Sequence, residues 1–113
     1  MTAALRERPS TGTRLRGVLL GQLAENRAQL IDHAERAWAS PTFSGGRHTI
    51  RLRFTGAAAI MAGERFIAAL PEHEFAMRGA LVAEAEVIAV RHHAAIDPPF
   101  LDVTTYLLVL DED

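Results

Sequence analysis

The sequence contains no cysteine, which excludes disulfide bonds, thiolate metal sites and cysteine nucleophiles. Long hydrophobic runs are missing as well. The longest, Ala57 to Ala62 and Leu107 to Leu110, fall far short of the roughly 20 residues that cross a bilayer. Near the N-terminus, Val18 to Leu20 is too brief for the apolar region of a secretory signal. We therefore expect a cytoplasmic protein without membrane association.

The sequence also lacks a marked excess of either charge, because 12 Lys and Arg stand against 14 Asp and Glu for a formal net charge of −2. Attraction to nucleic acid needs a basic surface, so we expect no nucleic-acid partner. The 113 residues suffice for one hydrophobic core but not for separate cofactor and substrate domains. We expect a flexible arm over residues 1–12, where Pro9 and its neighbours favour mobility, and a single domain over residues 13–113.

The hydrophobic period changes from two to about 3.6 in the middle of the chain. Alternate residues from His48 to Phe54 share one face, which indicates a half-buried strand. The apolar residues that follow recur at i, i+3 and i+4, which predicts a helix over residues 57–70 that packs on the sheet and ends before Pro71. Gly63 lies on the apolar stripe of this helix, so we expect the helix and the sheet to approach closely there.

A first hairpin is predicted around Ser44-Gly45-Gly46, because adjacent glycines supply the positive φ of tight turns. It pairs a strand over about residues 36–43 with the strand over residues 47–54. Pro41 cannot donate a hydrogen bond to a neighbouring strand. The earlier strand is therefore expected at an edge of the sheet.

A first helix is expected to begin on Thr13 as its cap and to end near Asn26, while residues 26–36 suit either a helix or a strand. A second hairpin is expected from a strand that begins at Leu81 and a strand over residues 101–110. The face predicted to point toward the helices comprises Leu81, Ala83, Ala85, Val87 and Ala89. The fold class is therefore α+β: a two-layer sandwich with a mainly antiparallel sheet, in the order α-β-β-α-β-β.

The last strand is apolar on both faces, and so is the nominal outer face of its partner strand. We predict that either the first helix or another subunit covers this second face. The predicted interface consists of Tyr106, Leu108, Leu110, Ile88 and Val90. Together with the absence of a catalytic pattern, this face favours a non-enzymatic, homo-oligomeric interaction module.

The five histidines do not suggest a metal site, because no two of them have the i, i+4 spacing of helical ligands. His48 is predicted to lie inward and to hydrogen-bond to the backbone. His92 and His93 are predicted to be solvated at the end of a hairpin. Asp32-His33 and Glu35 are interpreted as a solvated face rather than as an acid–base pair. We predict no catalytic residue, no cofactor and no metal ion.

Arg47, Arg51 and Arg53 form a row on the exposed face of their strand. If that strand neighbours the one that carries Glu84 and Glu86, ion pairs across the strands neutralise the row. Otherwise the row offers an alternative function, which is RNA binding through phosphate contacts.

A second alternative is a small-molecule binding domain or a small enzyme with a pocket between the sheet and the helix over residues 57–70. Trp38, the only tryptophan, and His48 are the residues predicted to line this pocket. Trp38 and Phe43 are predicted to lie on opposite faces of one strand, so that one anchors the core and the other meets a partner or the first helix.

The stretch Trp38-Ala39-Ser40-Pro41-Thr42-Phe43-Ser44-Gly45-Gly46-Arg47-His48 resembles small uncharacterised bacterial proteins, and this likeness implies no activity. Over about residues 36–113, the order of strand, helix and long hairpin with an acidic tail is similar to the phage tail-terminator-like family. The stretch Arg47-His48-Thr49-Ile50-Arg51-Leu52 contributes to that resemblance. Members of the family form rings at the end of a tail tube. The resemblance thus implies a structural homo-oligomer and assigns no site residues.

Overall fold

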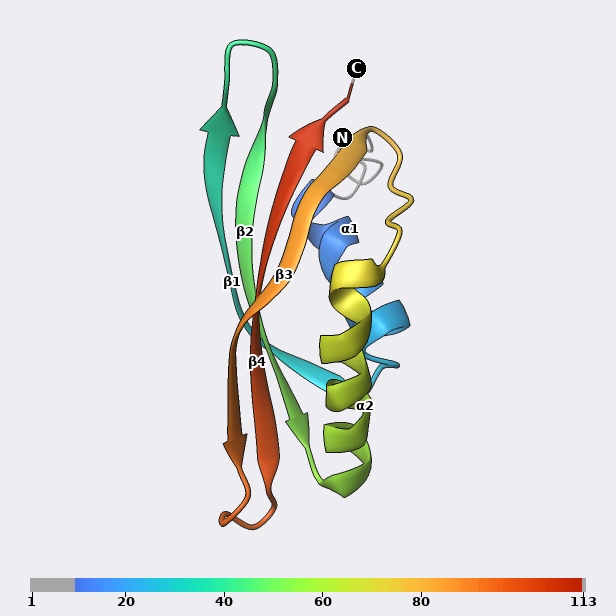
Figure 1. Cartoon of the computed structure of the whole chain (residues 1–113), viewed down its shortest axis with the longest axis vertical. Helices are drawn as coiled ribbons and strands as arrows, with labels where there is room; N and C mark the ends of the chain where they lie inside the picture. Colours follow the sequence, from blue (N-terminus) through green and yellow to red (C-terminus); the bar gives the residue numbers. More distant parts are fainter. Residues whose placement is uncertain (1–9, 113) are drawn as a thin grey trace, which may run out of the picture.

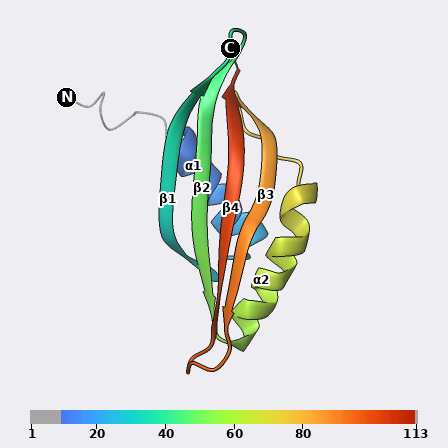
Figure 2. The same ribbon diagram turned by 60° about the vertical axis from the view of Figure 1, so that its left-hand side comes forward.

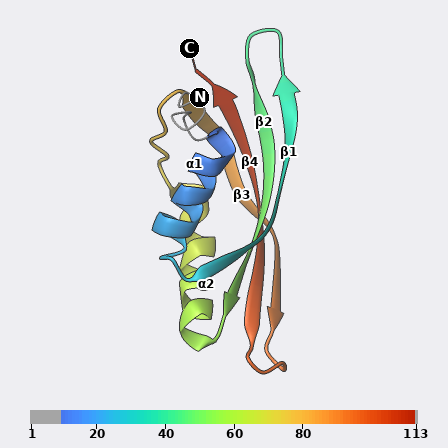
Figure 3. The same cartoon turned by 180° about the vertical axis from the view of Figure 1, so that it is seen from behind.

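The computed structural model describes residues 10–112 as two helical segments on one side of a four-stranded antiparallel sheet (Figure 1; Figure 3). The elements are α1 (Thr11–Gly17), the π-helical segment η2 (Val18–Leu23), β1 (Ala28–Ala39), β2 (Ser44–Thr55), α2 (Ala57–Ala69), the 3-10 turn η3 (Leu70–Glu72), β3 (Ala80–His93) and β4 (Phe100–Asp111). The strand order is β1-β2-β4-β3. This arrangement confirms the predicted α+β class and the order of its elements.

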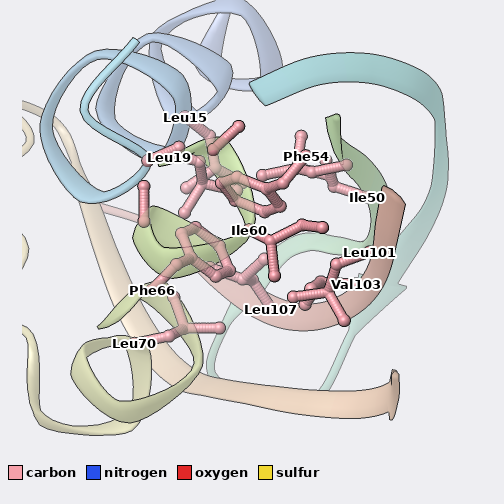
Figure 4. Close-up of a cluster of buried hydrophobic side chains, with 14 of the residues drawn as sticks. Leu15, Leu19, Ile50, Phe54, Ile60, Phe66, Leu70, Leu101, Val103 and Leu107 are labelled. Atoms are coloured by element: carbon pink, nitrogen blue, oxygen red, sulfur yellow. The ribbon is translucent and has the colours of Figure 1, made fainter. Parts of the chain in front are cut away.

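The core lies between the sheet and the helices (Figure 4). Ile50, Leu52 and Phe54 point from β2 into this layer and are fully buried, as the alternating pattern predicts. Phe66 of α2 packs on Phe54, with ring centroids 5.8 Å apart. A Cβ atom at Gly63 would lie 2.9 Å from side-chain atoms of Phe54. The predicted close approach between α2 and the sheet is therefore confirmed.

The first helix begins earlier than predicted, because Ser10 rather than Thr13 is its cap. The Ser10 Oγ accepts a hydrogen bond from the backbone N–H of Thr13 at 3.1 Å. Positive φ angles of 57° and 58° at Glu25 and Asn26 end the helical segment close to the predicted position. The ambiguous residues 26–36 are mostly strand, since β1 begins at Ala28.

The flexible arm predicted over residues 1–12 lies largely outside the described residues, which begin at Ser10. The three of its residues that the structure describes are ordered as part of the first helix: Ser10 caps α1, and Thr11 and Gly12 form its first turn.

The hairpin turn predicted at Ser44-Gly45-Gly46 was wrong. The chain turns at Ser40 to Phe43, where the backbone N–H of Ser40 donates to the Phe43 carbonyl at 2.7 Å. Both glycines lie within β2 and neither has a positive φ. Gly45 is needed for a different reason, because a Cβ there would collide with the backbone carbonyl of Val109 in β4. β1 does form an edge of the sheet, as predicted.

The faces predicted for β3 were only partly correct, because two β-bulges interrupt its alternation. The bulges fall between Val82 and Glu84 and between Val87 and Ala89. Each bulge adds one residue to β3 and shifts the residues beyond it to the other face. Ala85 and Val87 consequently face the helices as predicted, whereas Leu81 and Ala89 point to the opposite side.

Candidate functional site

Within residues 10–112, one face of the sheet carries no helix, and we call it the open face. Leu15 of α1 and Leu19 of η2 are fully buried in the same core cluster as Phe66 of α2, so both helical segments pack on the same side. In Figure 2 the four strands lie side by side with α1 behind them. The first helix therefore does not cover the second face of the sheet, which was one of the two predicted ways of covering it.

The strand register places the outward residues of the open face in rows across the four strands. Three neighbouring rows, read from β1 through β2 and β4 to β3, are Trp38, Gly45, Leu110 and Leu81; Arg36, Arg47, Leu108 and Glu84; and Ala34, Thr49, Tyr106 and Glu86. An apolar band crosses these rows and consists of Trp38, Leu110, Leu81, Leu108 and Tyr106. Leu81 is 49% exposed, so the band reaches solvent.

Three of the five predicted interface residues, Tyr106, Leu108 and Leu110, do lie together on the open face. Ile88 is the extra residue of a bulge and is 52% exposed. Val90 was misplaced, because it pairs with the fully buried Val103 and thus lies on the helix side of the sheet. The bulges explain this error and also explain why sequence reasoning missed Leu81.

Two arginines of the predicted row are neutralised by ion pairs, but not with the predicted partners. Arg51 donates to Asp32 of β1 at 3.0 Å, and Arg53 donates twice to Asp102 of β4 at 2.8 and 2.9 Å. Pairs with Glu84 and Glu86 do not form because β4 lies between β2 and β3. The hydrogen bonds from Arg53 lower the pKa of Asp102 and raise the pKa of Arg53 itself.

Four charged side chains in the three rows above take part in no ion pair within residues 10–112, and Arg91 of β3, which stands beside Asp102 outside these rows, is a fifth on the open face. Arg36 and Arg47 stand directly opposite each other on β1 and β2, and Glu84 and Glu86 lie on β3. All four residues are exposed. Like charges in directly opposed positions repel each other, so the Arg36–Arg47 pair has an unfavourable electrostatic energy in the isolated chain. Across the three rows that hold the apolar band, the open face is therefore positive near β1 and negative near β3.

A histidine network lies on the other side of β1 and β2, beneath α1. Arg16 Nη1 is 2.8 Å from His33 Nδ1, and His33 Nε2 is 2.8 Å from Nδ1 of the buried His48. A guanidinium group only donates, so His33 Nδ1 is the acceptor in the first hydrogen bond. His33 therefore carries its proton on Nε2 and donates to His48, whose own proton is left on Nε2.

Two glycines make room for this network. A Cβ atom at Gly12 of α1 would lie 3.2 Å from His33 Cε1, and one at Gly46 of β2 would lie 3.2 Å from His48 Nε2. Both distances are tighter than an ordinary contact, so a side chain at either position would push against the imidazole rings. The glycine at position 46 thus serves the histidine network rather than a turn.

Both imidazoles of the network are neutral at neutral pH. Burial lowers the pKa of His33 most. Repulsion from the protonated form of His48 and from Arg16 lowers this pKa further, while Glu35 raises it. Burial also lowers the pKa of His48, with Glu35 acting against burial and Arg16 adding to it. Glu35 Oε2 is 3.9 Å from His48 Nε2. Because His48 is neutral, this contact is not an ion pair at neutral pH.

The remaining predictions for the histidines had mixed outcomes. His48 is buried as predicted, but its partner is His33 rather than the backbone. Asp32-His33 and Glu35 do not form one solvated face, since Asp32 pairs with Arg51 on the open face and His33 belongs to the network. His92 is exposed, as predicted for a hairpin end, whereas His93 is half-buried and stacks on Phe100, with ring centroids 4.3 Å apart.

Trp38 and His48 do not line a common pocket. Trp38 pairs with Gly45 and points outward on the open face, whereas His48 pairs with Glu35 and points toward α1. The two side chains are therefore on opposite sides of the sheet. The pocket predicted between the sheet and the helix over residues 57–70 thus lacks its two proposed lining residues. Phe43 lies in the turn after β1 and is 51% exposed.

Comparisons with protein-family models, curated proteins and solved structures found no match to this chain. In the part of the chain that the structure describes, every helix is too short or too polar to span a membrane. The open face and the histidine network are the two features of the described residues that bear on function.

Proposed function

We propose that this protein is a non-enzymatic interaction module that self-associates through the open face of its sheet. The observation that carries the proposal is the apolar band of Trp38, Leu81, Tyr106, Leu108 and Leu110, which neither helical segment covers. Leu110 shows how the band packs: it is only 9% exposed, yet it does not belong to the core cluster on the helix side. The band is thus a second apolar layer on which no other element of the described residues 10–112 packs.

The size of the open face suits a stable association. Four strands about 4.8 Å apart, each rising about 3.3 Å per residue over about 12 residues, present a face of about 800 Å². One partner buries about 800 Å² in an interface of standard size. Charged groups flank the apolar band on both sides, as in an interface with an apolar centre and a polar rim.

Light scattering across the micromolar range tests the proposal. We expect wild-type protein to have a mass above that of one chain. Leu81→Asp places a charge in the band, in a row with Trp38, Gly45 and Leu110 that holds no cation, and should yield single chains, because an unpaired carboxylate is costly to bury. Met61→Asp is the matched control, since Met61 lies on α2 away from the open face and is 58% exposed. A wild-type mass equal to one chain would contradict the proposal.

The most specific form of this proposal is a tail-terminator-like assembly, supported by the similar order of elements. A ring requires two different surfaces of each subunit to meet, whereas a two-fold pair uses one surface twice. The outer edges of β1 and β3 have no neighbouring strand within residues 10–112 and offer such surfaces. Electron microscopy of wild-type particles should then show closed rings. Particles that are only compact pairs would reject the ring while retaining self-association.

A further inference from the structure

The open face has opposite charges on its two sides, and this segregation limits how two copies can meet. Arg36 and Arg47 lie in one row with Leu108 and Glu84, in that order across the sheet. Glu86 lies in the adjacent row, on the same side as Glu84. A partner that satisfies these groups must present carboxylates to β1 and guanidinium groups to β3. The same face of a second copy has both.

We infer that the open face binds a second copy of this chain about a two-fold axis parallel to the strands, with β1 of each copy over β3 of the other. This inference rests on the self-association proposed above and specifies its geometry. Such an axis exchanges the two sides of the sheet but keeps each row at its own height. Arg36 then faces Glu84 of the partner subunit, and Arg47 lies one strand away from it. The two-fold axis repeats this contact, so that Arg36 of the partner subunit faces Glu84 of the first.

The side-chain sizes along β2 and β4 fit this arrangement. β2 lies over β4 of the partner, so that Leu110 faces the partner's Gly45 and Tyr106 faces the partner's Thr49. In these two rows a large side chain meets a small one, and in the row between them Leu108 lies over the partner's Arg47, whose aliphatic stem can cover it. Small residues in two rows of three let the sheets approach to the usual distance of about 10 Å. Gly45 contributes a flat area of backbone on which Leu110 can rest.

Other arrangements satisfy the face less well. A two-fold axis that lies in the interface but runs across the strands would place β1 over β1 and β3 over β3, so that the side with Arg36 and Arg47 would lie over the same side of the partner subunit. Edge-to-edge pairing of β1 with β3 could join opposite charges, but it would leave Tyr106 and Leu108 in water. Only the axis parallel to the strands both pairs the charges and covers the apolar band.

A charge-swap experiment on the full-length protein tests this geometry. The variants are Arg36→Glu/Arg47→Glu and Glu84→Arg/Glu86→Arg, measured by light scattering alone and as an equimolar mixture. All four residues are exposed, and circular dichroism checks that both variants fold. Each variant alone places like charges against each other and should associate at least about tenfold more weakly than wild type. The mixture should regain association, because both sets of pairs are then attractive.

Two further variants make the result specific. Arg27→Glu/Arg78→Glu changes the net charge as much as Arg36→Glu/Arg47→Glu does, but in loops away from the open face, and should associate like wild type. Leu81→Asp added to both members of the mixture should abolish the regained association, whereas edge pairing leaves the open face in water and would tolerate this change.

The outcomes separate this inference from the proposal on which it rests. A wild-type protein that is a single chain would overturn both. Charge-swap variants that associate as tightly as wild type would overturn the two-fold geometry and leave self-association standing. A mixture that fails to regain association, or regains it despite Leu81→Asp, would likewise overturn the two-fold geometry.

Discussion

Acidification should destabilise the folded protein through the histidine network beneath α1. Burial lowers the pKa of His33 and of His48 below the ordinary value of 6.5, which both regain in the unfolded chain. The unfolded state therefore binds more protons than the folded state once the pH falls toward 6.5, and the free energy of unfolding must rise with pH in this window. The contribution of the network is fully present above pH 6.5. It is lost progressively as the pH falls below that value.

The hydrogen bonds of the network explain why protonation of either imidazole is unfavourable. His33 Nδ1 accepts a hydrogen bond from Arg16, and His48 Nδ1 accepts one from His33. A proton on either Nδ1 removes that acceptor, and on His33 it also sets an imidazolium against a guanidinium group. Glu35, the one carboxylate that acts on the pair among residues 10–112, favours protonation but lies 3.9 Å from His48 Nε2 and is exposed.

The size of the effect has a simple upper limit. A histidine that stays neutral in the folded state costs at most about 1.4 kcal/mol of stability per pH unit below its ordinary pKa. Two such histidines give at most about 2.7 kcal/mol per pH unit, and Glu35 reduces this value by favouring the protonated rings. A domain of this size is commonly stable by about 5–15 kcal/mol, so the loss would be a substantial fraction of the total.

Urea unfolding at a fixed protein concentration, from about pH 7.5 to about pH 5.5, measures this slope. Wild-type protein should lose stability across the range, and His33→Gln/His48→Gln should lose much less. His92→Gln is the control, because His92 lies exposed near the end of β3, and it should keep the wild-type slope. Equal slopes for the wild type and the double variant would refute the reasoning.

Two glycines in helical backbone should respond in opposite ways to alanine. Gly17→Ala should raise the free energy of unfolding by about 0.5–1 kcal/mol, because alanine favours a helix and nothing lies within 4 Å of the new Cβ. Gly63→Ala should lower it by about 1–3 kcal/mol, because its Cβ would lie 2.9 Å from Phe54; thermal denaturation of both variants checks the contrast. Asp102→Asn should lower the urea midpoint at neutral pH, because it removes the negative charge to which Arg53 donates two hydrogen bonds. The pKa of Asp102 is lowered in the folded state, so this difference should shrink as the pH falls below the ordinary value of 3.8, and a constant difference would contradict the assignment.

Local periodicity was enough to predict the central part of the fold. The alternation from His48 to Phe54 and the helical stripe that follows it depend only on neighbours in sequence, and α2 ends at Ala69, one residue from the predicted end. The hairpin turn could not be predicted in this way. Gly45 is required because a Cβ atom there would collide with the carbonyl of Val109, in a strand far along the chain. A glycine required by a distant strand looks the same in sequence as a glycine required by a turn.

The candidate site was predictable in part for the same reason. Apolar residues on both faces of the last strand indicated a second surface, and Tyr106 and Leu108 do lie there. The bulges in β3 carry no clear sequence signal, so Leu81 was assigned to the wrong face. His33 was missed because its contact with His48 depends on the register of β1 against β2 and on the placement of α1 over both.

The two sides of β1 and β2 serve different purposes, because alternation along a strand keeps neighbouring residues apart. His33 and His48 point toward α1, whereas Arg36 and Arg47 point to the open face. Salt screens exposed charges over about 10 Å at 0.1 M, so it should weaken contacts made by the arginines far more than hydrogen bonds within the buried network. Burial lowers the pKa of His33 and His48, so mild acid should destabilise the fold through this network. The salt dependence of association therefore reports on the open face, and the loss of stability in mild acid that His33→Gln/His48→Gln removes reports on the packing beneath α1.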